Sequence, residues 1–437
     1  MGKKNFVSYL LMLGNVIAVS FILVGCTREV SDHEMSIIDG TNTYTGLYTG
    51  ALKGKKPTGE GKFVVKIDDS SNWVYNGSFS EGLFAGEGNV ENYPCEIKLG
   101  DQNDGGIYTG AVNDGIINGV GAYKSSSGWS YEGKFENGTI VEDGSVKAYP
   151  YKLTYENTTL DGTYEGAVIG GVPNGVGSYE GKSDDVTVNY EGEWKDGNFS
   201  GDGKLKSNSY TISFKDGVVR TGEYEGATLE GKASGEGIFK AENDSGVKYV
   251  YSGNFANGLF DGMGTIEYES EDIKNYSGHF SEGDYAPTKS ELLVYLGNGK
   301  NFVFYKPSED TIKFIDAHEN LFMADSLEAI QEFLNAEVSS NEFYKTPDKF
   351  DDVLVKVKTK KITQIRQEDI YGNTVTWFGV DDVNNNRILG ICCGELPNVN
   401  NHDSIVLYGL PVNIGSFQNA FGATTNTFVI YGSFVEK

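Results

Sequence analysis

Apolar and polar positions alternate in short runs along residues 44–285, and the pattern restarts at regular intervals. In the stretch Tyr190 to Gly203, YEGEWKDGNFSGDG, the aromatic residues and glycines fall on one side of each run and the polar residues on the other. A two-residue type I′ turn at Asp196-Gly197 predicts an antiparallel hairpin in which Trp194 lies opposite Phe199 and the tyrosine lies opposite Gly203. The alternation therefore predicts half-buried antiparallel strand pairs.

The predicted hairpin gives its glycines a physical role. Because glycine has no Cβ, the ring of Tyr190 can lie flat across Gly203, which offsets the entropic cost of a glycine in a strand. Trp194 and Phe199 form a cross-strand aromatic pair worth roughly 0.2 to 1 kcal/mol. The tyrosine and its partner glycine are therefore expected to form the core of each hairpin.

The unit recurs along the chain. One copy has Glu142 where a glycine is expected, and two others have Pro57 and Ala233 in place of the second-strand aromatic. Units of two kinds alternate, which gives a super-repeat of about sixty residues, and in three super-repeats the second unit is followed by a degenerate strand pair. The copies begin at Tyr48, Tyr75, Tyr108, Tyr131, Tyr164, Tyr190, Tyr224 and Tyr251, and a truncated copy begins at Tyr276.

The unit Y-x-G-x-[FW]-x-x-G-x-x-x-G-x-G resembles the MORN repeat (membrane occupation and recognition nexus) over residues 44–285. The resemblance implies an elongated antiparallel β-meander of stacked hairpins. It also implies a role in scaffolding, in protein contact or near lipid, since the repeat is not known as a catalyst. Such an array offers a surface for partners rather than a deep pocket.

The N-terminus has the features of an export signal. A basic start at Lys3 and Lys4 precedes an uncharged, mostly apolar run that ends in Leu-Val-Gly-Cys, so residues 1–25 are predicted to be a signal peptide. The last four residues resemble a bacterial lipobox, which implies lipidation of Cys26 and an extracytoplasmic protein held at the membrane of a Gram-positive-like bacterium. An uncleaved membrane helix is the alternative, because the run is long enough to span. Residues 26–43 are predicted to be a polar tether.

The pattern changes after the repeats. Apolar residues recur at helical spacing, and Ser308 and Asp325 are expected N-caps, so residues 286–337 are predicted to form a small α-containing linker domain. Residues 338–437 contain five β-like runs, of which the first is long. Their order resembles the OB-fold domains of some Gram-positive exported lipoproteins, which implies a five-stranded barrel. The predicted fold class is mainly β.

The expected barrel suggests a ligand groove. Lys356, Lys358 and Lys360 are predicted to share one side of the first strand, with Trp377 and Phe378 nearby in sequence. Basic and aromatic side chains together bind oligosaccharides or single-stranded nucleic acid. The alternative is a solvated strand face beside core aromatics. An exported protein favours anionic envelope polymers as the ligand.

Charge and composition narrow the chemistry. The formal net charge of −26 disfavours nucleic acid as a partner of the repeats. The histidines are scattered without ligand spacing, so no metal site and no cofactor are expected. The adjacent Cys392 and Cys393 leave two possibilities open, a strained disulfide or one buried and one outward thiol.

Three classes of function remain. The first is a non-catalytic, lipid-anchored scaffold that contacts proteins or polymers of the cell envelope. The second is an exported envelope hydrolase, although the sequence shows no nucleophile elbow, no triad spacing and no zinc signature. The third is a regulator or immunity-type lipoprotein that captures one protein. We expect the first, with no catalytic residues, and the oligomeric state stays open.

Overall fold

The computed structural model describes residues 26–39, 42–99, 102–299, 303–335, 340–346, 349–418 and 422–437. These residues are mainly in β-strands, as the sequence predicts. The chain divides into two compact units. The first contains residues up to Leu153 with 161–179 and 194–198, and the second contains 154–160, 180–193 and 199–437.

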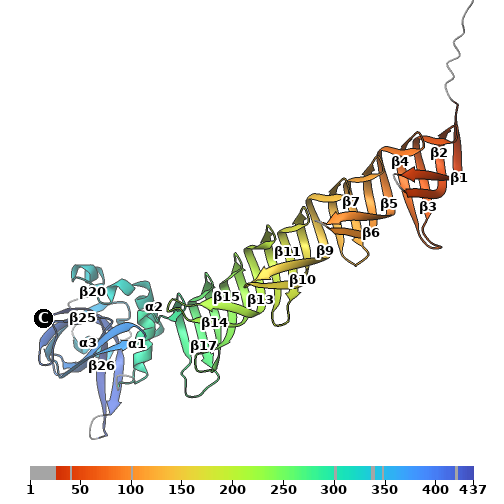
Figure 1. The fold of residues 1–437 in the computed structure, drawn as a ribbon. Helices are drawn as coiled ribbons and strands as arrows, with labels where there is room; N and C mark the ends of the chain where they lie inside the picture. Colours follow the sequence, from red (N-terminus) through yellow and green to blue (C-terminus); the bar gives the residue numbers. More distant parts are fainter. Residues whose placement is uncertain are drawn as a thin grey trace, which may run out of the picture. The chain divides into compact units, whose positions relative to one another are not determined.

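Antiparallel hairpins build the repeats of both units (Figure 1). In the first unit each strand from β1 to β9 pairs with the next along the chain, and in the second unit β13 to β19 do the same. The strands are β1 (Thr27–Asp39), β2 (Asn42–Lys53), β3 (Lys56–Lys66), β4 (Asn72–Ser80), β5 (Leu83–Leu99), β6 (Gln102–Asn113), β7 (Ile116–Ser125), β8 (Ser130–Glu136), β9 (Thr139–Tyr155), β10 (Thr158–Ile169), β11 (Val172–Lys182), β12 (Thr187–Lys195), β13 (Asn198–Ser213), β14 (Val219–Leu229), β15 (Lys232–Glu242), β16 (Lys248–Ala256), β17 (Leu259–Tyr268), β18 (Tyr276–Ser281) and β19 (Asp284–Tyr285).

Tyrosine rings lie across glycines in the core of the hairpins, as predicted. A Cβ added to Gly88 would lie 2.7 Å from Cε2 and Oη of Tyr75, so only glycine leaves room for that ring. Each tyrosine hydroxyl also donates a hydrogen bond to the carbonyl oxygen three residues further on, at 2.5 to 3.2 Å. This bond satisfies the buried hydroxyl and holds the ring in place. It recurs at Tyr48, Tyr75, Tyr108, Tyr131, Tyr164, Tyr190, Tyr224 and Tyr251.

The hairpin register differs from the predicted one beyond the turn. The turn itself is confirmed, because Asp196 and Gly197 have φ values of 49° and 80°. However, Gly192 takes the place opposite Gly203 that the sequence assigned to the tyrosine, since a Cβ on Gly192 would lie 2.5 Å from the Gly203 Cα. Gly201, with a φ of 49°, is the extra residue of a β-bulge, and other copies show the same shift.

Glu142 occupies this bulge position in one copy. Its φ of 52° is the left-handed conformation that glycines adopt elsewhere in the array, and it costs a residue with a side chain about 1–2 kcal/mol. The pairing around it is unchanged, with Gly133 opposite Gly144 and Phe135 opposite Ile140. The substitution therefore strains one hairpin without altering its register.

The buried tyrosines predict how the array responds to alkali. Burial raises the pKa of Tyr75, Tyr164 and Tyr190 from 10 to about 12. The folded state thus retains protons that the unfolded chain loses, so we expect full stability below about pH 10 and a progressive loss as the pH rises towards about 12. Urea midpoints measured across this range, beside tyrosinate absorbance, test this. Midpoints that stay constant between pH 10 and 12 would contradict it.

The predicted tether, residues 26–43, is corrected to a strand over most of its length. β1 pairs antiparallel with β2 along its length. A bulge at Asp32 reverses the alternation of the strand, which conceals it in the sequence, and the Asp32 N–H donates to Thr49 Oγ1 at 3.1 Å. The same bulge occurs in β5, where the Asn92 N–H donates to Thr109 Oγ1 at 3.0 Å. β1 therefore shares with β5 the bulge and its side-chain hydrogen bond.

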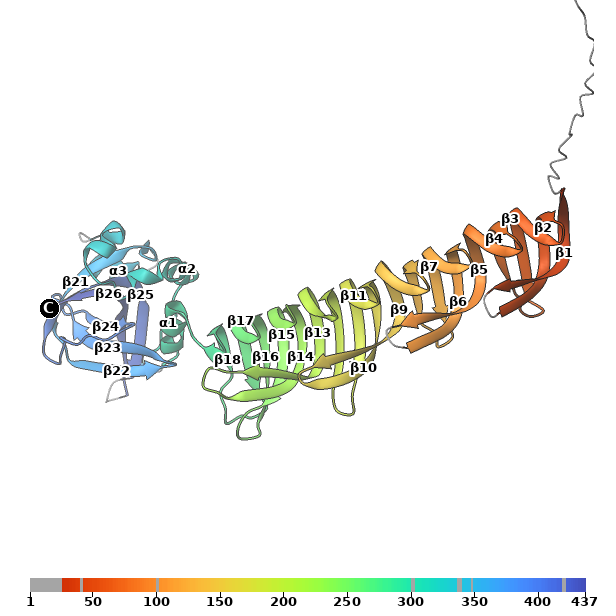
Figure 2. The ribbon, with the colours of Figure 1, turned by 45° about the horizontal axis from the view of Figure 1, so that its top comes forward.

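The helices after the repeats belong to the C-terminal domain, which corrects the predicted linker domain at 286–337. Leu293, Ile315 and Ile330 are fully buried in one cluster with Ile391 and Leu410 of the C-terminal sheet. Figure 2 shows α1 and α2 together beside this sheet. The elements are α1 (Lys289–Gly297), α2 (Glu309–Ala317), η1 (Glu319–Leu321), η2 (Glu328–Phe333), α3 (Ser340–Lys345), and the strands β20 (Leu334–Asn335), β21 (Leu354–Lys361), β22 (Gln364–Ile370), β23 (Asn373–Asp381), β24 (Arg387–Cys392), β25 (Ser404–Gln418) and β26 (Thr424–Glu436).

The predicted helix starts are partly confirmed. Ser308 caps α2, since its side chain accepts from the Thr311 N–H. Asp325 is not an N-cap, because the segment after it forms only the short 3₁₀ helix η2. The sequence prediction missed α1, which begins with a capping box of Thr288 and Glu291.

The C-terminal sheet is mixed. Its order is β20-β21-β25-β26-β24-β23-β22, in which the pairs β20–β21 and β24–β26 are parallel and the others antiparallel. The predicted long first strand is divided into β21 and β22, so the described sheet has more than the five predicted strands. One bridge between Thr359 and Asp382 links the end of β21 to the end of β23. A hydrophobic cluster that contains Phe378 and Ile430 is separate from the hydrophobic cluster that packs under the helices.

Candidate functional site

Cys26, the predicted lipidation site, is exposed and directly precedes β1. The predicted signal peptide, residues 1–25, lies outside the described residues. Among the helices that the structure does describe, none is long and apolar enough to cross a membrane.

The three lysines of the predicted groove alternate along β21 with the buried residues Val355, Val357 and Thr359. Lys356 Nζ is 5.4 Å from the centroid of the Tyr408 ring, a distance at which a cation and an aromatic ring attract. Lys358 and Lys360 are exposed, and Lys360 Nζ donates to Asn385 Oδ1. We call Lys356, Lys358 and Lys360 the lysine strip.

The structure does not bring the predicted aromatics to the lysine strip. Phe378 is fully buried among the residues packed against β21 and β25, and Trp377 is 5% exposed in the cluster that the helices cover. Arg366 lies 5.7 Å from the Trp377 ring centroid. Neither ring offers a face to a ligand, so the aromatic part of the predicted groove is corrected to core. Of the residues of the predicted groove, Lys358 and Lys360 are the exposed ones.

The adjacent cysteines point to opposite sides of their strand. Cys392 is fully buried in the cluster of Phe378, whereas Cys393 packs against the helix-covered cluster, where its Sγ lies 2.6 Å from Tyr431 Oη. Both are free thiols, and burial raises the pKa of each. The nucleophilic thiolate is therefore disfavoured at neutral pH. Burial likewise raises the pKa of Cys95 to about 12.

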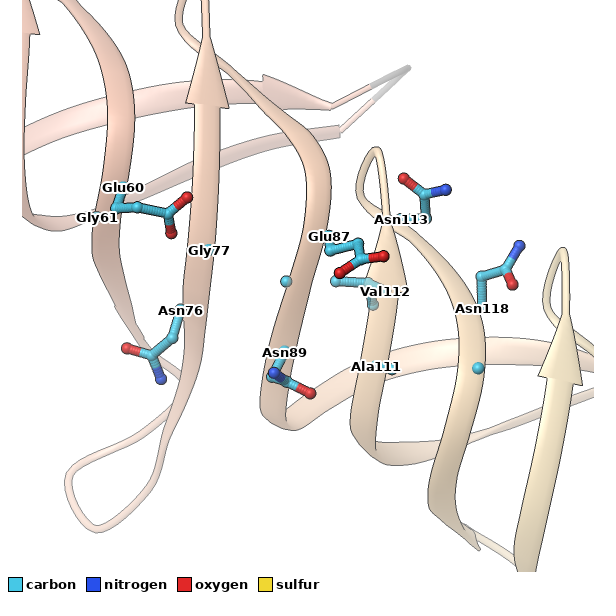
Figure 3. A pocket seen from close by; sticks show the side chains of 12 residues that line it. Glu60, Gly61, Asn76, Gly77, Glu87, Asn89, Ala111, Val112, Asn113 and Asn118 are labelled. Atoms are coloured by element: carbon cyan, nitrogen blue, oxygen red, sulfur yellow. The ribbon is translucent and has the colours of Figure 1, made fainter.

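A groove of about 630 Å³ crosses the outward face of the first repeats (Figure 3). Its side chains come from β3 to β7, and no lysine or arginine is among the described residues that line it. We call it the repeat groove. Its polar side chains are Glu60, Asn76, Glu87, Asn89, Asn113 and Asn118.

The carboxylates of the repeat groove are exposed. Glu60 accepts a hydrogen bond from Ser78 Oγ, and its charge adds to burial in raising the pKa of Tyr75 to about 12. Glu87 forms no hydrogen bond or ion pair with the residues that the structure describes. Both glutamates lie twelve residues after the tyrosine of their unit, so this position in the repeat is a signal that sequence reasoning missed.

The second unit has a smaller pocket of about 260 Å³ on its repeats, and there the charges are paired. Lys206 lies 2.8 Å from Glu225, and Lys240 lies 3.4 Å from Glu223. These ion pairs are exposed and add little stability, but they neutralise the face. The repeat groove differs from this pocket because its carboxylates have no cationic neighbour in the lining.

Comparisons with known proteins agree with the hairpin geometry. The profile of the MORN repeat family matches residues 108–130, 164–186, 190–212 and 251–273. The chain carries MORN repeats. Each matched MORN repeat begins with a tyrosine that makes the recurrent hydroxyl–carbonyl bond. The unmatched units at Tyr48, Tyr75, Tyr131 and Tyr224 make the same bond and have the same fold.

A similar curated protein is Alsin of Rattus norvegicus. The two are 36% identical over 81 residues, which cover 18% of this chain and 5% of Alsin. The chain thus spans only a small part of that protein. The 81 matched residues correspond in length to a few MORN repeats.

Proposed function

We propose that this chain is a lipid-anchored, extracytoplasmic scaffold of a bacterial cell envelope. Its MORN repeats and C-terminal domain contact proteins or envelope polymers, without catalysis. The observation that carries the proposal is the repeated hairpin, which buries its tyrosines on one face and leaves a polar outer face along β3 to β7 for a partner. Repeat arrays of this kind present binding surfaces in place of enclosed active sites.

The anchor rests on the sequence Leu-Val-Gly-Cys and on the position of Cys26. The thiol precedes β1 directly and is exposed, so a lipid on it would attach the first MORN repeat at the membrane surface. One acyl anchor alone binds membranes weakly, and a diacylglyceryl group supplies the two chains that stable anchoring needs.

The C-terminal domain is proposed to be OB-like. Taking β21 and β22 as one bent first strand, β23 to β26 follow as strands two to five. The pairings are then one with two, two with three, three parallel to five, five with four, and four with one. This order supports a Greek-key barrel. The helices cover the face that bears Trp377, so we assign contact with anionic polymers to the lysine strip.

Mass spectrometry of the N-terminus tests the anchor. We expect a diacylglyceryl thioether on Cys26 and no residues before it. Cys95→Ser is expected to keep this modification, and Cys26→Ser to lose it. An unmodified chain that still begins at Met1 would overturn the anchor and favour an uncleaved membrane helix.

Binding to an anionic polyol-phosphate wall polymer tests the lysine strip. Replacing Lys356, Lys358 and Lys360 with glutamine is expected to weaken binding roughly tenfold. The matched control makes the same charge change on exposed repeat lysines, with no more than a small effect. If both variants lost polymer binding equally, the overall charge of the protein, and not the lysine strip, would account for the binding. The control positions are Lys62, Lys195 and Lys204.

A further inference from the structure

The repeat groove has the length of a short extended peptide. Its polar side chains follow one another across neighbouring strands of the first unit (Figure 3), from Glu60 on β3 to Asn118 on β7. Adjacent strands lie about 4.8 Å apart, so the groove spans roughly 19 Å. A peptide in the extended polyproline II conformation rises about 3.1 Å per residue, and about six residues therefore fit along the groove.

The two carboxylates are spaced for two separate cations. Glu60 lies on β3 and Glu87 on β5, two strands apart and hence about 10 Å between the strands that carry them. Oxygen ligands lie 2.3–2.6 Å from a bound calcium ion, so this spacing does not suit one ion. Three residues of a polyproline II chain cover about 9 Å and make one full turn, so side chains three residues apart point the same way. Two basic side chains three residues apart would each face one glutamate.

The amides between and beyond the glutamates suit a peptide backbone. Asn76 lies on β4 between the two acidic strands, and Asn113 and Asn118 continue the groove on β6 and β7. An asparagine side chain both donates and accepts hydrogen bonds, as a peptide group does. Strands β3 to β7 together supply carboxylates for basic side chains and amides for the main chain of a peptide.

We propose that the repeat groove binds an extended peptide segment of about six residues with two basic side chains three residues apart. The partner is a protein with such a segment exposed. The charge of the groove complements it, because the lining carries Glu60 and Glu87 and no basic residue. This assignment goes beyond the proposed function and is independent of the lipid anchor and of the lysine strip.

Peptide isomers test the spacing. The full chain, purified in detergent, is titrated into a labelled Lys-Gly-Gly-Lys-Gly-Gly peptide and into its isomer Lys-Lys-Gly-Gly-Gly-Gly, and binding is followed by fluorescence anisotropy. We expect the spaced peptide to bind roughly threefold tighter or more, since only it reaches both carboxylates. Equal affinities would overturn the proposal. Spermine that competes as strongly as the spaced peptide would also overturn it and assign the groove to small polyamines.

Matched glutamine variants test the place of binding. The double variant Glu60→Gln and Glu87→Gln is expected to weaken the spaced peptide roughly fivefold. Glu236→Gln makes a single charge change at the same position of a repeat in the second unit, and we expect less than a twofold effect. Asn76→Ala should weaken binding of the spaced peptide and leave binding of spermine unchanged. A loss per charge as large for Glu236→Gln as for the groove would mean that the net negative charge alone attracts the peptide.

Discussion

Gly88→Ala is expected to lower the free energy of unfolding of the first unit by about 3 kcal/mol. The new Cβ would lie 2.7 Å from two atoms of the Tyr75 ring. That ring cannot move aside, because its hydroxyl donates a hydrogen bond to the Ser78 carbonyl at 2.9 Å and its centroid lies 4.4 Å from the centroid of the Phe84 ring. Urea unfolding followed by circular dichroism measures the change.

Gly105→Ala is the matched control. Gly105 also lies in a strand of the first unit, but a Cβ added there meets no atom within 4 Å. The substitution should therefore be neutral or stabilise by up to about 1 kcal/mol, because alanine restricts the unfolded chain. If both variants were destabilised equally, the glycines would act through backbone conformation and the role assigned to the tyrosine ring would be wrong.

The hairpins of the repeats could be predicted because each signal is local. The turn at Asp196-Gly197, the alternation on both sides of it and the tyrosine–glycine pairing all lie within fourteen residues of sequence. The bulge at Gly201 could not be predicted from one copy, since a glycine at an apolar position suits both a regular strand and a bulge. Its positive φ is visible only in the structure.

Errors in the sequence interpretation occurred where distant segments decide burial. The strand β1 contains a bulge at Asp32, which breaks the alternation that a strand prediction needs. The segments of α2 and η2 were assigned to a linker because their periodicity shows an apolar face but not what that face covers. In the structure it covers the C-terminal sheet, including Trp377 and Ile391.

The candidate sites were predictable to different degrees. The lysine strip follows from simple alternation, because every second residue of a strand shares a face. The repeat groove was missed although Glu60 and Glu87 occupy the same position of successive units. Comparing the outward positions between units would have found it. Val120 and Val176 occupy that position in two later units of the first compact unit and are exposed, whereas the unit that begins at Tyr131 has Asp143 there.

Trp377→Ala is expected to destabilise the C-terminal domain by about 3–5 kcal/mol, the usual cost of removing a buried tryptophan. The side chain is 5% exposed and packs in the cluster shared with α1 and α2. Its indole N–H has no hydrogen-bond partner among the residues that the structure describes, so its contribution comes from apolar burial. Thermal unfolding of the full chain, with the transition of this domain followed by near-ultraviolet circular dichroism, measures the loss.

Lys358→Ala provides the comparison, since both residues belong to the groove that the sequence predicted. Lys358 is exposed, so its replacement should change the free energy of unfolding by no more than about 0.5 kcal/mol. The same substitution should weaken binding of the anionic polymer. If Trp377→Ala left the stability unchanged and weakened polymer binding, the prediction of an aromatic ligand groove would be supported after all. The opposite result, lost stability with unchanged polymer binding, means that Trp377 belongs to the core under the helices. The domain then binds a polymer at β21 through charge alone.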